Sequence, residues 1–184
     1  MSFLDLVLDR AFVYAWIGLT ALFGLSATLS SALYFSYGGQ FGDLVEGLVA
    51  ERVELLEELP LPQGLLFLAI FSNNATIALL SAALSFLLVV PLLVIMLNGA
   101  LVGFLLSATS VEASSLGLPS AAAYFLLVPH GVLEVPALSL ASSAFVGLLG
   151  GRRYVRFVVA SSLLALTMLL CAALVEQVLI ILVR

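Results

Sequence analysis

The sequence predicts an all-α integral membrane protein, a polytopic bundle of about five transmembrane helices in a single domain over residues 1–184. Apolar residues make up 64% of the chain and charged residues only 9%, and the mean hydropathy is +1.29. Charges cluster in short patches between apolar runs that reach the roughly 20 residues a spanning helix needs. A soluble domain needs far more charge on its surface, so we exclude that class.

The charged residues also exclude several kinds of partner. The net charge is −5, and all six cations are arginines, which argues against nucleic acid and against a polybasic lipid-binding tail. The start of the chain, MSFLDLVLDR, lacks the basic region of a secretory signal. We expect membrane lipids as partners, together with a protein partner or a second copy of the chain.

The first two elements are a span and an acidic segment. Residues 11–35 predict the first transmembrane helix. Residues 37–60 combine helically spaced apolar residues with acidic ones such as Asp43, Glu46 and Glu54. This pattern predicts an amphipathic helix on the extracytoplasmic membrane surface. The alternative interpretation is a platform that binds a basic partner.

The next stretch predicts two spans joined tightly. Residues 61–111 contain no charge and are too many for one helix. Pro91 stands where a helix can begin, because proline is tolerated in the first turn. We therefore expect spans at about 65–90 and 91–110. A kink or a partly re-entrant path is the alternative.

The last third of the chain predicts a broken helix and a final span. Pro129, Gly131 and Pro136 interrupt the apolar stretch 120–151, and a proline inside a helix removes a hydrogen bond and clashes with the preceding turn. We expect a break and turn within residues 129–136, with residues 138–150 completing the crossing. Whether residues 120–136 cross or re-enter the membrane stays open. The final span is about 157–183.

The arginines predict the orientation. Arg10 precedes the first span, and residues 151–156 contain three more arginines. Five spans put both groups on one side, and positive charge marks the cytoplasmic side. We expect a cell membrane protein with a cytoplasmic N-terminus.

Five polar side chains interrupt the apolar spans and form a candidate intramembrane site: Asn73, Asn74, Asn98, His130 and Glu134. Such groups face a bundle interior and are functional candidates by default. They can fix helix register through hydrogen bonds, relay protons or contact a substrate. His130 and Glu134 have helical i, i+4 spacing, but no second histidine supports metal binding. We assign no catalytic residue, no metal and no cofactor.

Small residues at four-residue spacing predict close helix contacts. One such series contains Gly99, Gly103 and Ser107, and another contains Asn74, Ala78 and Ala82. The third consists of Ser139, Ser143, Gly147 and Gly151.

Three motifs in order, FSNNATIALL, LNGALVG and PHGVLEVPAL, resemble the stage II sporulation protein M family. The resemblance covers about residues 65–151 and maps the family's motif positions onto Asn73 or Asn74, Asn98, Gly99, Pro129, His130, Gly131 and Glu134. It implies a helical membrane protein of about five spans. The founding bacterial members of that family act with two peptidoglycan-degrading partners during engulfment of the forespore and serve there as a membrane anchor or scaffold.

Three functions follow as hypotheses. The first is a non-enzymatic membrane scaffold or anchor for envelope or membrane complexes. The second is a transport or permease component with a polar site around His130 and Glu134. An intramembrane enzyme is the third, and it is disfavoured because no nucleophile motif accompanies His130.

Overall fold

The computed structural model describes residues 9–57, 63–115, 121–149 and 154–183, and these are helical apart from a cap and a turn. Side chains are described for residues 9–37, 67–68, 71–111, 131–148, 154–175 and 177–178. The helices are α2 (Arg10–Glu57), α3 (Gln63–Ala83), α4 (Val89–Ser115), α5 (Ala121–Ser142), the 3₁₀ turn η1 (Ser143–Phe145), α6 (Val146–Leu149) and α7 (Tyr154–Val183). Within the part of the chain that the structure describes, four segments are long and apolar enough to cross a membrane: Arg10–Tyr37, Val89–Val111, Gly131–Leu148 and Tyr154–Val175. The predicted all-α membrane bundle is confirmed.

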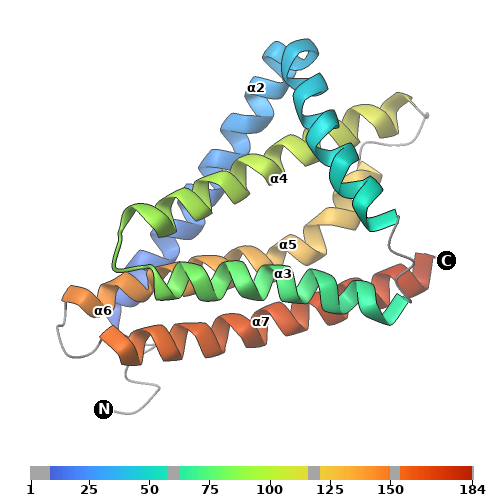
Figure 1. Ribbon diagram of the computed structural model, residues 1–184. Coiled ribbons are helices and arrows are strands. Elements are labelled where there is room, and N and C mark those ends of the chain that lie inside the picture. The colour runs from blue at the N-terminus through green and yellow to red at the C-terminus, as the bar shows by residue number, and fades with distance from the viewer. Residues whose placement is uncertain (1–8, 58–62, 116–120, 150–153, 184) are drawn as a thin grey trace.

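Helix α2 begins at a carboxylate cap and bends at Tyr37. The Asp9 Oδ1 atom accepts the backbone N–H groups of Ala11 at 2.9 Å and Phe12 at 3.4 Å, which satisfies two donors of the first turn. Tyr37 has φ −129° and ψ 16°, outside helical values, and the helix continues beyond it to Glu57 in a new direction (Figure 1). The predicted helix at 37–60 is therefore present as backbone to Glu57, while its side chains lie outside the described residues.

A short turn joins α3 to α4, as the uncharged stretch predicted. It occupies residues 84–88, so α3 ends earlier than expected, and Pro91 lies in the first turn of α4. The Tyr154 hydroxyl of α7 hydrogen-bonds to the backbone at this turn. It accepts the Phe86 N–H at 3.2 Å and donates to the Ala83 carbonyl at 3.1 Å. A side chain of another helix thus satisfies polar groups that an apolar turn cannot.

Helices α2 and α4 pack with almost no space between their backbones. A Cβ atom built on Gly103 would lie 2.0 Å from the Ala27 carbonyl oxygen, and one on Gly99 would lie 2.6 Å from that of Phe23. Two serines of α2 hydrogen-bond across the same contact. Ser26 donates to the Met96 carbonyl at 2.7 Å and Ser30 to that of Ala100 at 2.6 Å.

Helix α5 lies at the centre of the bundle. Every residue from 137 to 144 is buried. Alanines of α3, α5 and α7 meet there, among them Ala78, Ala141 and Ala165. The Ser81 and Ser142 hydroxyls hydrogen-bond at 2.7 Å between α3 and α5. The small side chains let three helices approach one another closely.

The helices form two groups, the α2–α4 pair and an α3–α5–α7 layer, which meet at one end and diverge toward the other (Figure 1). At the closed end the rings of Phe12 and Phe157 lie 5.5 Å apart. The Trp16 indole Nε1 also donates to the Pro136 carbonyl at 3.0 Å. These contacts place the start of α2 beside the start of α7, and therefore Arg10 at the same end of the bundle as Arg156.

The predicted break at Pro129, Gly131 and Pro136 is wrong. Helix α5 runs without interruption from Ala121 to Ser142, and Gly131 does not have a positive φ. The chain departs from α-helix only at Ser143–Phe145. The two prolines stand about two turns apart, so their missing N–H groups fall on one side of the helix. In a membrane bundle, neighbouring helices can satisfy the backbone groups that a proline leaves unpaired, so a proline need not break the helix. The steric rule for proline in an isolated helix leaves out these neighbours.

The glycine contact predicts a sharp difference between two alanine substitutions. We expect Gly103→Ala to destabilise the protein by about 1–3 kcal/mol, because the new methyl group meets backbone that no rotamer change can move. Gly18→Ala on α2 is the matched control, since a Cβ there meets nothing within 4 Å. It should be neutral, or stabilising by up to about 1 kcal/mol. Thermal unfolding in detergent compares them, and equal midpoints would contradict the packing described.

Candidate intramembrane polar site

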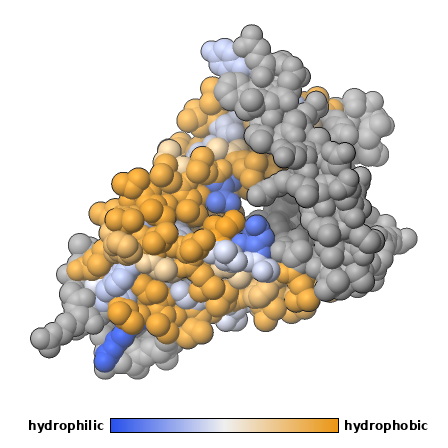
Figure 2. Space-filling model, viewed as in Figure 1, coloured by the Kyte–Doolittle hydropathy of each residue, from blue (hydrophilic) through white to orange (hydrophobic). Residues whose placement is uncertain are grey.

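A pocket of about 560 Å³ lies where the two helix groups diverge. Its walls come from four helices: Phe23 of α2, Asn74 of α3, Val102 of α4 and Glu134 of α5 are representative. Figure 2 shows hydrophilic atoms gathered around a hollow on a face that is otherwise largely hydrophobic. The volume falls within the range of about 300–1,000 Å³ that is typical of small-molecule sites.

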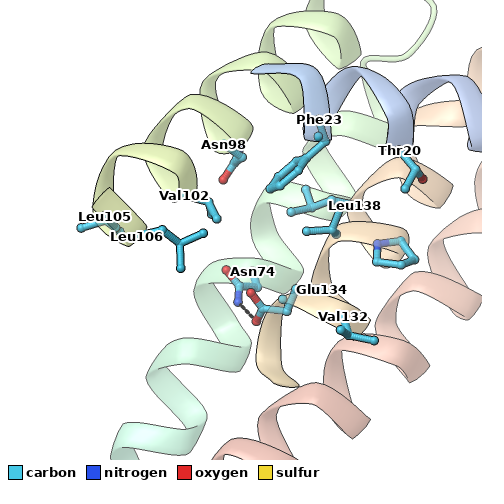
Figure 3. A pocket seen from close by; sticks show the side chains of 14 residues that line it. Thr20, Phe23, Asn74, Asn98, Val102, Leu105, Leu106, Val132, Glu134 and Leu138 are labelled. Atoms are coloured by element: carbon cyan, nitrogen blue, oxygen red, sulfur yellow. Dashed lines mark hydrogen bonds between the residues drawn. The ribbon is translucent and has the colours of Figure 1, made fainter. Parts of the chain in front are cut away.

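Asn74 and Glu134 form the polar centre of the pocket wall. The Asn74 Nδ2 group donates a hydrogen bond to Glu134 Oε1 across the α3–α5 contact, and both side chains face Val102 and Leu106 of α4 (Figure 3). Both residues are half-buried. A charged residue at membrane depth costs about 2.5–3.5 kcal/mol on insertion scales, and a neighbouring donor offsets part of that cost.

The structure brings some of the other predicted residues to this pair. Asn98 lines the same pocket from α4, although its Nδ2 group donates to the Val94 carbonyl of its own helix at 2.7 Å. Asn73 is exposed, and its Nδ2 atom lies 3.3 Å from Asn74 Oδ1. Of the two adjacent asparagines, Asn74 is therefore the one that lines the pocket. The His130 and Pro129 side chains lie outside the described residues.

The predicted packing residues lie in two places. Gly99 and Gly103 lie at the α2–α4 contact. Gly147 lies against α7, where an added Cβ would be 2.7 Å from the Tyr154 Cα. Ser139 of α5 and Ser143 of η1 are fully buried, and Ser143 donates to the Leu140 carbonyl at 2.7 Å. Gly151 lies outside the described residues.

Sequence reasoning missed two residues of the pocket region. Thr20 lines the pocket from α2, and its hydroxyl donates to the Trp16 carbonyl at 2.9 Å. Trp16, the only tryptophan of the chain, bonds the Pro136 carbonyl. A buried indole needs a hydrogen-bond acceptor, so a lone tryptophan in a span was a usable signal of a polar contact.

The arrangement offers one carboxylate, two amides and a hydroxyl on an otherwise apolar wall. Among the described residues, no three histidine, cysteine, aspartate or glutamate side chains come together as a metal site would require. These side chains can form hydrogen bonds and interact with a charged group within an apolar cavity.

The Asn74–Glu134 bond predicts an energetic coupling that a double-mutant cycle measures. With Asn74→Leu and Glu134→Leu, we expect the two stability losses to be non-additive by about 0.6–1.7 kcal/mol, the range from average to largest for such bonds in membranes. The control pair Thr167→Val with Glu134→Leu should be additive within about 0.5 kcal/mol, because the Thr167 hydroxyl donates to the Leu163 carbonyl of α7, outside this network. Reversible unfolding in mixed micelles supplies the values, and equal coupling in both cycles would refute the assignment.

The comparisons with known proteins agree with the fold. No curated protein and no solved structure matches the chain. The family model described as stage II sporulation protein M matches residues 11–179, which includes every helix of the pocket and most of the chain. The chain therefore belongs to the stage II sporulation protein M family.

Proposed function

We propose that this multi-pass membrane protein is a non-enzymatic scaffold or anchor for envelope or membrane complexes. The direct connection between two helical segments of α2 carries the proposal. The segment Arg10–Tyr37 is followed at the Tyr37 kink by a second helical segment to Glu57, with no loop between them, so the acidic stretch is attached directly to the membrane bundle. That stretch, residues 38–57, has five acidic residues and a single arginine: Asp43, Glu46, Glu51, Arg52, Glu54 and Glu57. A charged helical arm suits recruitment of a basic protein surface.

The scaffold has an orientation in this proposal. We place the N-terminus and residues 151–156 in the cytoplasm of a cell membrane and the acidic arm outside. The adjacency of the two arginine-bearing ends supports this, because both then obey the positive-inside rule. A membrane-impermeant thiol reagent checks it, using a cysteine at Ser2 in a Cys171→Ser background. Labelling of that cysteine in intact cells would reverse the orientation.

Partner recruitment by the arm is testable with a photo-crosslinking amino acid. Placed at Glu54 in native membranes, it should give a discrete adduct with a protein partner. Neutralising the arm by Asp43→Asn, Glu46→Gln, Glu51→Gln and Glu57→Gln should remove most of that adduct, because the attraction is electrostatic. The control position is Leu163 of α7, which is 56% exposed on the apolar outside of the bundle. Equal adducts from Glu54 in the charged and neutralised arms would contradict the proposal.

A transport component is the second candidate, and the pocket beside Glu134 is the observation in its favour. Discontinuous helices often form transporter sites, whereas α5 is continuous through both prolines, and this favours the scaffold. Purified protein in liposomes distinguishes them. Ion or solute flux that Glu134→Gln abolishes would support transport over the scaffold.

A further inference from the structure

The turn between α3 and α4 exposes a cluster of large apolar side chains. Five of the residues from 84 to 89 are between 37% and 64% exposed: Leu84, Phe86, Leu87, Leu88 and Val89. The surrounding stretch 61–111 contains no charged residue. Contiguous apolar patches are rare on surfaces that face water. The side chains of this turn therefore suit a lipid environment.

The exposed surface of the turn continues the outer surface of the spans. Leu92, Leu93 and Leu97 on α4 are exposed, and they lie in the segment Val89–Val111, which is able to cross a membrane. Leu80 is exposed on α3, one helical turn before that helix ends. Figure 2 shows hydrophobic surface reaching this end of the bundle. The turn is thus the end of one apolar surface that lipid already covers along the spans.

The backbone of the turn has its hydrogen-bond partners within the protein. Each N–H group from residue 84 to residue 87 has an acceptor, and three of these acceptors are carbonyl oxygens at 2.9–3.3 Å. The fourth is the Tyr154 hydroxyl, which accepts the Phe86 N–H at 3.2 Å. The Ser85 hydroxyl donates to the Ala82 carbonyl at 2.7 Å. Hydrocarbon offers no hydrogen-bond partner, so irregular backbone is stable there only when the protein supplies the partners.

Tyr154 and Arg156 indicate the depth of the turn. The turn lies at the same end of the bundle as α6 (Figure 1), level with Tyr154, the first residue of α7. Arg156 is exposed two residues farther along α7. An arginine near the end of a span extends its guanidinium to the headgroups while its stem stays among the acyl chains, and tyrosine is enriched at the same boundary. The turn therefore lies close to the boundary between headgroups and acyl chains.

From these observations we propose that the turn 84–88 is inserted into the leaflet at this end of the bundle and contacts acyl chains there. Insertion places its apolar side chains about 5–10 Å into the boundary region. Helices α3 and α4 then form a hairpin whose tip stays within the membrane. The Tyr154 hydroxyl holds the tip there, because it supplies the acceptor for the Phe86 N–H. The inserted tip is separate from the scaffold role and does not depend on it.

A spin label measures the depth of the turn. A nitroxide is attached to Leu87→Cys in a Cys171→Ser background, with the full chain in lipid nanodiscs. Oxygen concentrates among acyl chains and a nickel chelate stays in water, so their relative effects on nitroxide relaxation report depth. We expect oxygen to dominate at residue 87, at a depth of about 5–10 Å. The matched control is Leu101→Cys, which is similarly exposed near the middle of α4 and should lie deeper.

One hydroxyl group tests how the tip is held. Tyr154→Phe should move the label at residue 87 toward water and increase its relaxation by the nickel chelate, because the Phe86 N–H then needs a water molecule. Tyr14→Phe is the matched control. It removes the hydroxyl of an exposed tyrosine on α2, one helical turn from the Phe12–Phe157 contact, and should leave the label where it was.

Three results would overturn the proposal. Stronger relaxation by the nickel chelate than by oxygen, with Tyr154 intact, would place the turn in water. Weak relaxation by both reagents would show that protein covers the turn, either another segment of the chain or a second copy. An unchanged depth in Tyr154→Phe would refute the role of the hydroxyl. The photo-crosslinking result for the acidic arm is independent of all these outcomes.

Discussion

The glycine contact between α2 and α4 is the constraint on which the rest of the bundle depends. Lipid chains are as apolar as leucine, so helices in a membrane gain little from burying apolar surface against one another. They associate when their backbones come close. Gly99 and Gly103 permit this against Phe23 and Ala27. The Ser26 and Ser30 hydroxyls then reach carbonyls of α4 at the same four-residue interval. The bonded residues increase in number together, from Ser26 with Met96 to Ser30 with Ala100, so α2 and α4 run parallel. The chain must therefore return through α3, which precedes α4 in the sequence.

A paired α2–α4 unit leaves the other long helices to form their own layer. Alanines and serines allow α3, α5 and α7 to pack around residues 137–144, with Ser81 and Ser142 joined inside. Each group is therefore held by its own short-range contacts. Aromatic rings such as Phe12 and Phe157 hold the groups together at one end. The pocket forms at the other end, where close contact between the groups stops.

The sequence predicted the positions of the helices better than the contacts between them. Charge-free length predicted two helices at residues 65–110, and the structure has α3 and α4 there, with Pro91 in the first turn of α4. The series beginning at Gly99 identified residues that lie in a helix contact. The break around Pro129 and Pro136 was wrong because the rule describes an isolated helix, whereas α5 is packed among its neighbours. The Tyr154 hydroxyl that serves the turn at 84–88 could not be predicted, since it is distant in sequence and only the fold brings it there.

The candidate site was expected for one reason and exists for another. A broken helix was to release backbone carbonyls and so create a polar interior around Glu134. The helix is intact, yet Glu134 still meets Asn74 beside a pocket of about 560 Å³. The space comes from the separation of two helix groups, and the polarity comes from side chains on the inner faces of α3, α4 and α5. Because each wall belongs to a separately packed group, the shape of the site is set by the angle between the groups. A break within one helix is therefore unnecessary for placing a carboxylate at membrane depth in this fold.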